Sequence, residues 1–420
     1  MIYQYQKERR AGFYFILAFS ILLPYSTGAA ASDMRFDVNT YGYLSWRVEK
    51  VWEELSVDGT GNTVTADAPR ETTIPSFNIM MQSNVGENAR VFVNLNGKDA
   101  EDVTVSNIWG EYKVNTLVNL RVGKTYRRFG LYNEILDAVP TYIGIEPPEL
   151  FDKDHLILSR TTLAMMHGWV PLGDGELSYS LTFDDGEGGP TPEDNYPLGF
   201  DLRYDFNLGN STVGMSGYSS NGDTTSDVSL GDGSPRSGVL PWMSADDFSV
   251  IGAYGEFQIH ALKLQAAYWT ASHDATRDAD AIVTVVNNAG INANQRDRFL
   301  LDTTAPVTTA NVDTNGDYDV TTWYIRAGYS FETSKGELVP YFQWDHYDNP
   351  ETIENKSFGG DAEAGLTDNG KFSKSTIGII YRPIPQVALK FDTSTHFQDF
   401  NGRSESFSEI RFDISYIFGQ

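Results

Sequence analysis

Hydrophobic and polar residues alternate over long segments of this chain. In residues 198–208, Leu198 and Phe200 begin a series of hydrophobic residues at every second position, and Asp201 belongs to the polar series between them. A period of two residues predicts a β-strand with one apolar and one polar face. The segment 406–418 repeats this pattern at the end of the chain. Both segments are about twice as long as an ordinary strand, which favours a sheet that crosses a membrane.

The same pattern predicts sixteen strands. Their connections are alternately short and mostly long, which is typical of a transmembrane β-barrel with short turns on one side and loops on the other. A closed barrel also leaves no backbone group unpaired in lipid. We therefore predict an all-β fold, a transmembrane antiparallel β-barrel over residues 32–420. The strands are expected at 36–48, 74–85, 88–98, 104–115, 117–128, 159–170, 175–184, 197–208, 211–220, 247–259, 261–272, 320–332, 336–347, 372–382, 386–397 and 406–418.

The first 31 residues have the pattern of a secretory signal peptide. Basic residues around Arg9 precede an apolar run over residues 13–23, and Ala29–Ala31 supplies a cleavage site of small residues. The apolar run is too short to cross a bilayer as a helix, for which about 20 residues are needed. We expect residues 1–31 to be removed during export, and residues 32–420 to be placed in the cell outer membrane.

Composition excludes several classes of function. The chain has 31 basic and 57 acidic residues, a formal net charge of −26, and no cysteine. A nucleic-acid partner is not expected, because nucleic-acid binding requires a basic face. Without cysteine there is no thiolate nucleophile or Cys-ligated metal. No Gly-x-Ser-x-Gly motif or zinc-binding histidine pair occurs, so we expect neither an enzyme nor a cofactor.

The run Val122–Glu134, VGKTYRRFGLYNE, resembles the strand-to-loop motif of Gram-negative porins related to the phosphate-selective porin O/P family. Arg128 stands where these porins often have proline. The resemblance implies passive diffusion of small hydrophilic solutes through a channel that is often a homotrimer. The last strand also resembles the one that the barrel-assembly machinery recognises, although Phe418 is followed by two further residues. Phosphate selectivity is not implied, because the expected lysine-rich constriction is missing.

The connection 129–158 is expected to fold into the barrel and narrow the pore. It is more apolar than a solvated loop, and its prolines stiffen it. It carries six acids against one lysine, and we expect these acids to face arginines of the wall. An outward loop packed on a neighbouring subunit is the alternative. The candidate constriction residues are Arg47, Arg90, Arg121, Arg127, Glu134, Asp137, Glu146 and Glu149.

The charge pattern favours a weak preference for cations. Basic and acidic residues face the lumen in nearly equal numbers, so the surplus negative charge lies mainly in the loops. Small polar solutes or ions, outer-membrane lipid and lipopolysaccharide are the expected partners. One alternative is a substrate-specific channel for phosphate or a sugar. The other is a structural or adhesive barrel that does not conduct.

Residues 313–319 contain a weak candidate for a metal site. Asp313, Asn315, Asp317 and Asp319 place oxygen ligands at the spacing found at the front of a calcium loop. The acid expected at the twelfth position is absent, and Tyr324 stands there. A turn rich in Asp, Asn and Gly explains the same residues, and the main expectation is that the chain binds no metal.

Overall fold

The computed structural model divides the chain into two units, Met1–Asp37 and Val38–Gln420. The predicted signal peptide lies outside the described residues and stays a prediction. No helix in the described part of the chain is long and apolar enough to span a membrane. The structure describes residues 38–52, 54–57, 63–66, 70–99, 101–136, 138–149, 156, 160–184, 197–206, 210–221, 238–288, 293–352, 362–363, 366–367, 371–400 and 403–419.

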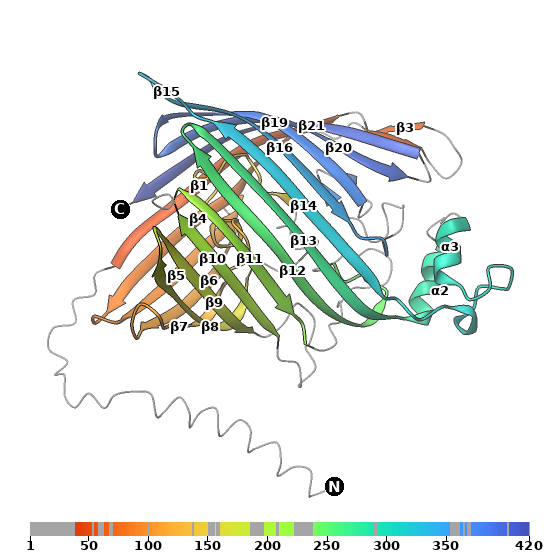
Figure 1. The fold of residues 1–420 in the computed structure, drawn as a ribbon. Helices are drawn as coiled ribbons and strands as arrows, with labels where there is room; N and C mark the ends of the chain where they lie inside the picture. Colours follow the sequence, from red (N-terminus) through yellow and green to blue (C-terminus); the bar gives the residue numbers. More distant parts are fainter. Residues whose placement is uncertain are drawn as a thin grey trace, which may run out of the picture. The chain divides into compact units, whose positions relative to one another are not determined.

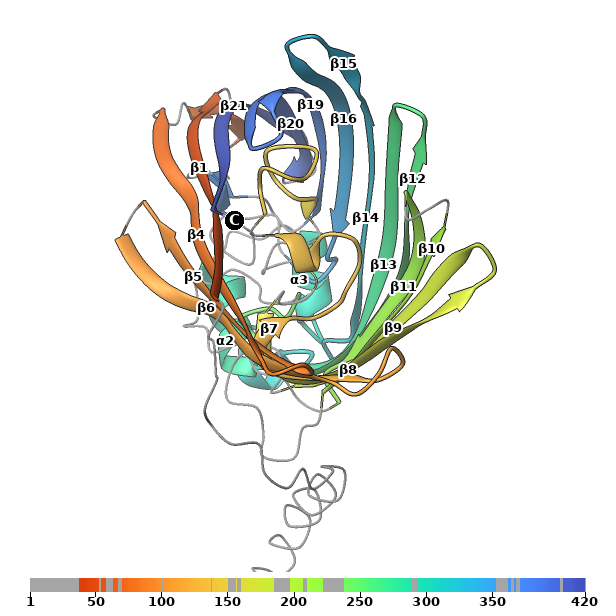
Figure 2. The ribbon, with the colours of Figure 1, turned by 90° about the vertical axis from the view of Figure 1, so that its left-hand side faces the viewer.

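Sixteen antiparallel strands form one closed barrel, as predicted (Figures 1 and 2). Each strand pairs with the next along the chain, and the last pairs with the first. We count β14 and β15 as one strand interrupted at Ser330, because both pair with β16. The strands are β1 (Val38–Trp52), β4 (Glu71–Val85), β5 (Ala89–Lys98), β6 (Glu101–Lys113), β7 (Asn119–Tyr126), β8 (Arg160–Leu172), β9 (Gly175–Asp184), β10 (Leu198–Phe206), β11 (Ser211–Ser219), β12 (Met243–Ile259), β13 (Leu262–Arg277), β14 (Tyr318–Tyr329) with β15 (Phe331–Thr333), β16 (Gly336–Asp348), β19 (Lys371–Ile384), β20 (Val387–Phe400) and β21 (Arg403–Gly419).

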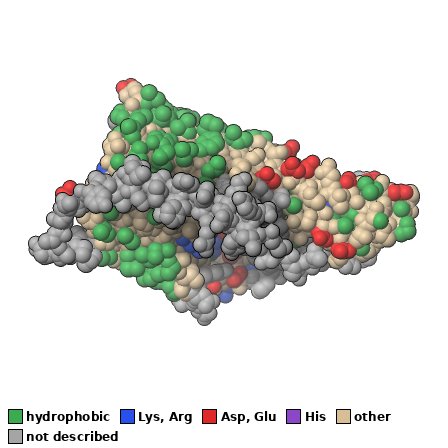
Figure 3. Space-filling view, turned by 90° about the horizontal axis from the view of Figure 1, so that it is seen from below, with side chains coloured by type: hydrophobic (Ala, Val, Ile, Leu, Met, Phe, Trp, Pro, Cys, Tyr) green, Lys and Arg blue, Asp and Glu red, His purple; other side chains and the backbone are tan. Residues whose placement is uncertain are grey.

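The two faces of the sheet follow the alternation in the sequence. In β13, Gln265, Ala267 and Trp269 are buried, whereas Ala266 and Tyr268 between them are exposed. The outward side chains are largely apolar and form the hydrophobic surface that Figure 3 shows over the strands. Polar side chains of the wall point inward instead. The period of two residues therefore determines the inside and the outside of the barrel.

Strand length differs around the barrel. β7 has 8 residues, whereas β12 has 17 and β13 has 16. About 9–11 tilted residues cross the hydrocarbon region, so β12 and β13 are long enough to extend beyond it. The sequence placed the end of the β13 segment at residue 272, but the strand continues to Arg277. Two helices follow this extension in the chain.

Two helices follow β13, α2 (Ala279–Asn288) and α3 (Ala293–Phe299). α2 begins after Asp278, whose carboxylate accepts a hydrogen bond from the backbone N–H of Ala281 at 2.8 Å and caps the helix. The apolar side chains of α2, among them Ile282 and Val285, are buried in the main hydrophobic core. Acidic side chains gather toward the end of the molecule at which these helices lie (Figure 3).

The remaining elements are short. Two small hairpins lie outside the barrel sheet, β2 (Glu54–Val57) with β3 (Thr63–Ala66), and β17 (Ala362–Glu363) with β18 (Leu366–Thr367). A 3-10 turn, η3 (Thr309–Asn311), lies between α3 and β14. Another, η1 (Asn133–Ile135), lies in the connection between β7 and β8.

Candidate functional site

The connection after β7 packs against the inner wall of the barrel (Figure 2). Its apolar side chains join the core formed by β12, β13 and β14. The Phe129 ring stacks on Trp269 with centroids 5.4 Å apart, and the Tyr132 ring meets Tyr324 edge to face at 6.1 Å. The apolar residues of the loop thus find partners on this side of the wall, which explains why so hydrophobic a segment is not solvated.

Two buried basic side chains of the wall bind the backbone of this loop. The Lys390 ammonium donates to the carbonyl oxygens of Val139, Tyr142 and Gly144 at 2.5, 3.2 and 2.6 Å. The Arg326 guanidinium donates to the carbonyl oxygen of Ile143 and, at 3.0 Å, to that of Glu146. Buried carbonyl groups in an irregular segment need such donors, since water does not reach them.

Gly144 permits the sharp turn at this point. Its φ of +97° lies in the region that side chains disfavour. A Cβ atom added there would lie 3.1 Å from the Glu146 carbonyl oxygen and 3.2 Å from Nη2 of Arg326. The glycine therefore allows both the backbone conformation and the close approach of the guanidinium.

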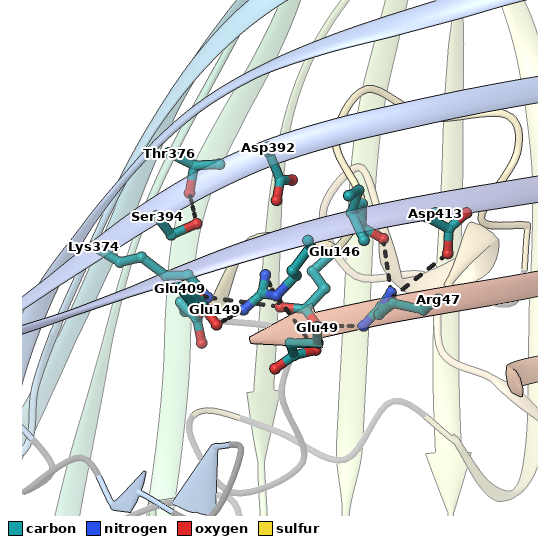
Figure 4. A network of polar contacts seen from close by, with 12 residues as sticks. Arg47, Glu49, Glu146, Glu149, Lys374, Thr376, Asp392, Ser394, Glu409 and Asp413 are labelled. Atoms are coloured by element: carbon teal, nitrogen blue, oxygen red, sulfur yellow. Dashed lines mark hydrogen bonds and ion pairs between the residues drawn. The ribbon is translucent and has the colours of Figure 1, made fainter. Parts of the chain in front are cut away.

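The next residues of the loop place two carboxylates among three basic side chains (Figure 4). Glu146 accepts from Nη1 of Arg47 at 2.7 Å and lies 2.5 Å from Nη1 of Arg411. Glu149 accepts from Nζ of Lys374 at 2.6 Å, and the same ammonium lies 3.6 Å from Glu146. These charge-assisted contacts join the loop to β1, β19 and β21.

Acids of the wall balance the basic side chains of this network. Glu409 lies 3.2 Å from Nζ of Lys374 and also pairs with Arg411. Glu49 lies 3.6 Å from Arg411. Each basic group therefore contacts more than one carboxylate, which offsets the cost of removing it from water. The exposed fraction of the Glu146 side chain is 29%, against 2% for Lys374, so Glu146 is the more accessible to the lumen.

Glu134 forms a second charged contact at the start of the loop. It lies 3.3 Å from Nε of Arg128 and 3.6 Å from Nη2 of Arg203, with 30% of its side chain exposed. Burial alone would raise the pKa of the Glu134 carboxyl. The guanidinium groups of Arg128 and Arg203, with a further contribution from Arg121, outweigh burial and hold this pKa below its ordinary value. Glu134 therefore remains ionised at lower pH than an ordinary glutamate.

A cavity of about 350 Å³ lies at the ends of β4 to β8 where the short turns 86–88 and 114–118 connect the strands. Glu111 lies in its wall and pairs with Arg90 at 2.7 Å and Arg121 at 2.8 Å, and its Oε2 atom is 3.0 Å from Nε2 of His167. The cavity is lined by Asn84, Glu87, Asn88, Ala89, Arg90, Glu111, Lys113, Thr116, Asn119, Arg128, His167 and Trp169. Basic groups and amides thus predominate on its surface.

The structure brings together only part of the predicted constriction. Arg47 contacts the loop acid Glu146, in agreement with the expected facing of acids and arginines. Arg90 and Arg121 instead pair with Glu111 of their own wall. Arg127 is buried, with its Nε atom 2.8 Å from Asp184 and its guanidinium 4.5 Å from the Tyr218 ring. Its contacts with β9 and β11 make it part of the wall. Asp137 lies outside the described residues.

Sequence reasoning missed Lys374 as a contact of the loop. The signal was present, because the predicted strand 372–382 puts Lys374 on the same face as Arg382. The alternation also puts Lys390, Arg326 and Arg411 on the inner faces of their predicted strands, but nothing in it indicated that they bind the loop. Such contacts depend on which distant strands the loop crosses, and a period of two residues carries no information on that.

The candidate metal residues form hydrogen bonds of a turn. The Asp313 carboxylate accepts from the backbone N–H of Asn315 at 3.1 Å, and that of Asp317 accepts from Ala275 at 3.0 Å. Nη1 of Arg277 donates to the carbonyl oxygens of Asp313 and Asn315. Within the described ranges, no group of three or more His, Asp or Glu residues is placed to hold a metal ion. The turn rich in Asp, Asn and Gly accounts for these contacts.

No protein-family model and no curated protein matches this chain. Solved structures with the same architecture do match it. The outer membrane channel DcaP of Acinetobacter baumannii is 13% identical with a TM-score of 0.54, covering 93% of this chain and 100% of the channel. An anion-selective porin from Comamonas acidovorans is 11% identical with a TM-score of 0.55, covering 91% and 100%. The fold is therefore the sixteen-stranded antiparallel β-barrel found in outer-membrane porins.

Proposed function

We propose that this protein is an outer-membrane porin through which small hydrophilic solutes or ions diffuse without an energy source. One observation carries the proposal. The connection between β7 and β8 packs inside a closed sixteen-stranded barrel and is held there by basic side chains of the wall. A barrel of this size has room for an aqueous lumen, and an internal loop narrows such a lumen. No catalytic role is proposed for any residue.

The passage runs along the wall from β4 to β8, opposite the apolar packing of the loop. The cavity of about 350 Å³ lies at the short-turn end of this wall, where Arg90 and Glu111 line it and Arg121 pairs with Glu111. Glu134 and Glu146 are the partly exposed acids on the loop side. We propose these five residues, together with Arg47 and Glu149, as the charged lining of the constriction.

We further propose a weak preference for cations. Loop acids and wall bases nearly balance at the described constriction, so the net charge of −26 acts mainly through other parts of the chain. A mouth of one sign raises the local concentration of counter-ions. A channel selective for phosphate is the alternative. Lys374 and Lys390 both contact the loop, although the sequence did not indicate a lysine-rich constriction.

A sugar-specific channel is the second alternative, favoured by an aromatic cluster on the open wall. Phe92 and Trp109 stack with centroids 5.1 Å apart, and Tyr41 and Tyr43 pack beside them. Sugars bind to the faces of such rings. Trp109 is only 9% exposed, however, and Arg121 lies 4.2 Å from its centroid. Within this cluster only Tyr41 and Tyr43 have partly exposed rings on which a sugar could stack. We therefore favour general diffusion over a sugar-specific channel.

We also propose how the chain is exported, inserted and assembled. The predicted signal peptide would export the chain, and the barrel-assembly machinery would insert it through its last strand, β21. The outward apolar surface suits outer-membrane lipid, and acidic groups near α2 and α3 suit lipopolysaccharide bridged by divalent ions. We propose a homotrimer on the resemblance to porins.

Planar-bilayer recording tests the function. The purified mature protein should insert and give stepwise increases of conductance in potassium chloride. A correctly folded barrel, shown by a β-rich circular dichroism spectrum and a heat-modifiable band, that gives no conductance would support the structural or adhesive alternative. Saturation of the current by phosphate or by a sugar would support the corresponding specific channel.

A further inference from the structure

Lys390 lies on the inner face of β20 and is fully buried, with an exposed fraction of 0%. Its ammonium group contacts three backbone carbonyl oxygens, those of Val139, Tyr142 and Gly144. An ammonium group has three N–H donors, so each donor has one carbonyl partner. The Tyr142 ring also lies 4.9 Å from Nζ, which adds a cation–π contact.

This set of ligands is unusual for a buried lysine. None of the carboxylates that the structure describes pairs with Lys390, although its cross-strand neighbour is Asp413. The Asp413 carboxylate interacts with Ser45 and Arg47 instead. The Lys390 ammonium therefore donates its hydrogen bonds to neutral oxygens of the loop, as a bound ammonium ion would, and Asp413 acts on its charge only from beyond ion-pair distance. The loop turns around this charge at Gly144, whose φ is positive and whose carbonyl oxygen contacts the ammonium.

We infer that Lys390 is the positioning residue of the constriction, and that the loop contains a carbonyl site for a small monovalent cation which the Lys390 ammonium occupies. The inference rests on the proposed porin function and deepens it. Val139, Tyr142 and Gly144 precede Glu146 closely in sequence, so the ammonium fixes the segment that brings this acid to Arg47 and Arg411. Removal of the charge releases this segment and changes the width of the passage.

The site also has a predicted specificity. Three carbonyl oxygens around a buried point suit an ion with several N–H donors or a small bare cation, because each oxygen then keeps a partner. Methylammonium has three N–H donors and fits the space vacated by a shortened side chain. Choline has no N–H donor and is larger, so it cannot replace these contacts. A small ammonium ion should therefore restore the loop where the side chain cannot.

Single-channel recording tests this inference. Lys390→Met keeps the length of the side chain but removes its donors, and we expect the conductance to change by about twofold or more, with added current noise. Lys390→Ala should behave similarly and also leave space for an ion. Methylammonium chloride added to K390A in potassium chloride should return the conductance toward the wild-type value, whereas equal choline chloride should not.

Lys263→Met is the matched control, since Lys263 pairs with Glu256 of β12 at 2.9 Å and is not among the described contacts of the loop. Its conductance should equal that of the wild type. A wild type that does not conduct would overturn the porin function itself. A conducting wild type with unchanged K390M and K390A channels would overturn only the role of Lys390, as would equal effects of methylammonium and choline. If no Lys390 variant forms a heat-modifiable barrel, with or without methylammonium, Lys390 is needed for barrel assembly. That result would also overturn its role in positioning the loop.

Discussion

Replacing Glu134 and Glu146 together by glutamine should reduce the preference for cations. Their side chains are 30% and 29% exposed, against 12% for Glu149, so they act most directly on a passing ion. Glutamine keeps the size and one acceptor oxygen of each side chain, and the loop retains its backbone contacts with Lys390 and Arg326. The substitution therefore changes charge with little change of shape.

The size of the effect follows from Coulomb's law. In water, a unit charge about 7 Å from a passing ion changes the energy of that ion by about 0.6 kcal/mol. Screening at 0.1 M ionic strength reduces this value to roughly half. Because cations and anions respond with opposite sign, each carboxylate should change the permeability ratio by about threefold. At about 1 M salt the Debye length falls to about 3 Å, and the effect should nearly vanish.

Reversal potentials across a potassium chloride gradient measure this ratio. Glu149→Gln should have a smaller effect than either of the other substitutions, because its carboxylate is less exposed. Asp348→Asn is the control, since Asp348 follows the inward-facing Tyr347 in β16 and pairs with Lys371 on the outer face. An unchanged ratio in the double variant would refute the electrostatic argument. Anion selectivity of the wild type would refute the proposed preference itself.

Three further predictions concern the wall, the loop and pH. Ile377→Arg, on the lipid face of β19 where Ile377 is 63% exposed, should reduce the stability of the inserted barrel by roughly 2–4 kcal/mol in denaturant titrations, whereas the inward Thr376→Val should assemble normally. Gly144→Ala should destabilise the loop by about 1–2 kcal/mol and increase its cleavage by protease, because the residue has a φ of +97°. The ionised Glu134 carboxylate should contribute to cation preference and to stability, and both contributions should be lost as the pH falls through its lowered pKa. Arg203→Gln should raise that pKa, so that the change of reversal potential with pH occurs at higher pH than in the wild type. Identical pH profiles of the variant and the wild type would contradict this.

The barrel could be predicted because its information is local. A strand that faces lipid on one side and polar groups on the other repeats every second residue, so its presence follows from a short window of sequence. Charged pairs across neighbouring strands can also be predicted from a short stretch of sequence. Arg90, Glu111 and Arg121 face one another in register on β5, β6 and β7, which are joined by short turns. Their ion pairs, 2.7 Å for Arg90 with Glu111 and 2.8 Å for Arg121 with Glu111, join neighbouring strands.

The arrangement of the loop could not be predicted, because its partners are distant in sequence. Lys390 lies 251 residues after Val139, and Arg326 lies 180 residues after Glu146. Composition indicated that the loop was too apolar for solvent, but it did not indicate which side of the barrel the loop would cover. The extension of β13 beyond residue 272 was missed for a related reason. Arg277 at its end pairs at 2.7 Å with Glu351, which lies 74 residues later in the chain.

The position of the loop explains why the passage should lie to one side of the barrel. A single apolar core extends from Phe129 and Tyr132 through Trp269 to Trp242 and the buried face of α2. This core occupies the side of the lumen formed by β12 to β16, and the hydrophobic effect holds it closed to water. The wall from β4 to β8 instead carries charged and amide groups beside a small aromatic cluster, and the cavity of about 350 Å³ lies at its short-turn end. The loop therefore divides the interior of the barrel into a packed side that fixes its geometry and a polar side, through which we propose that solutes pass.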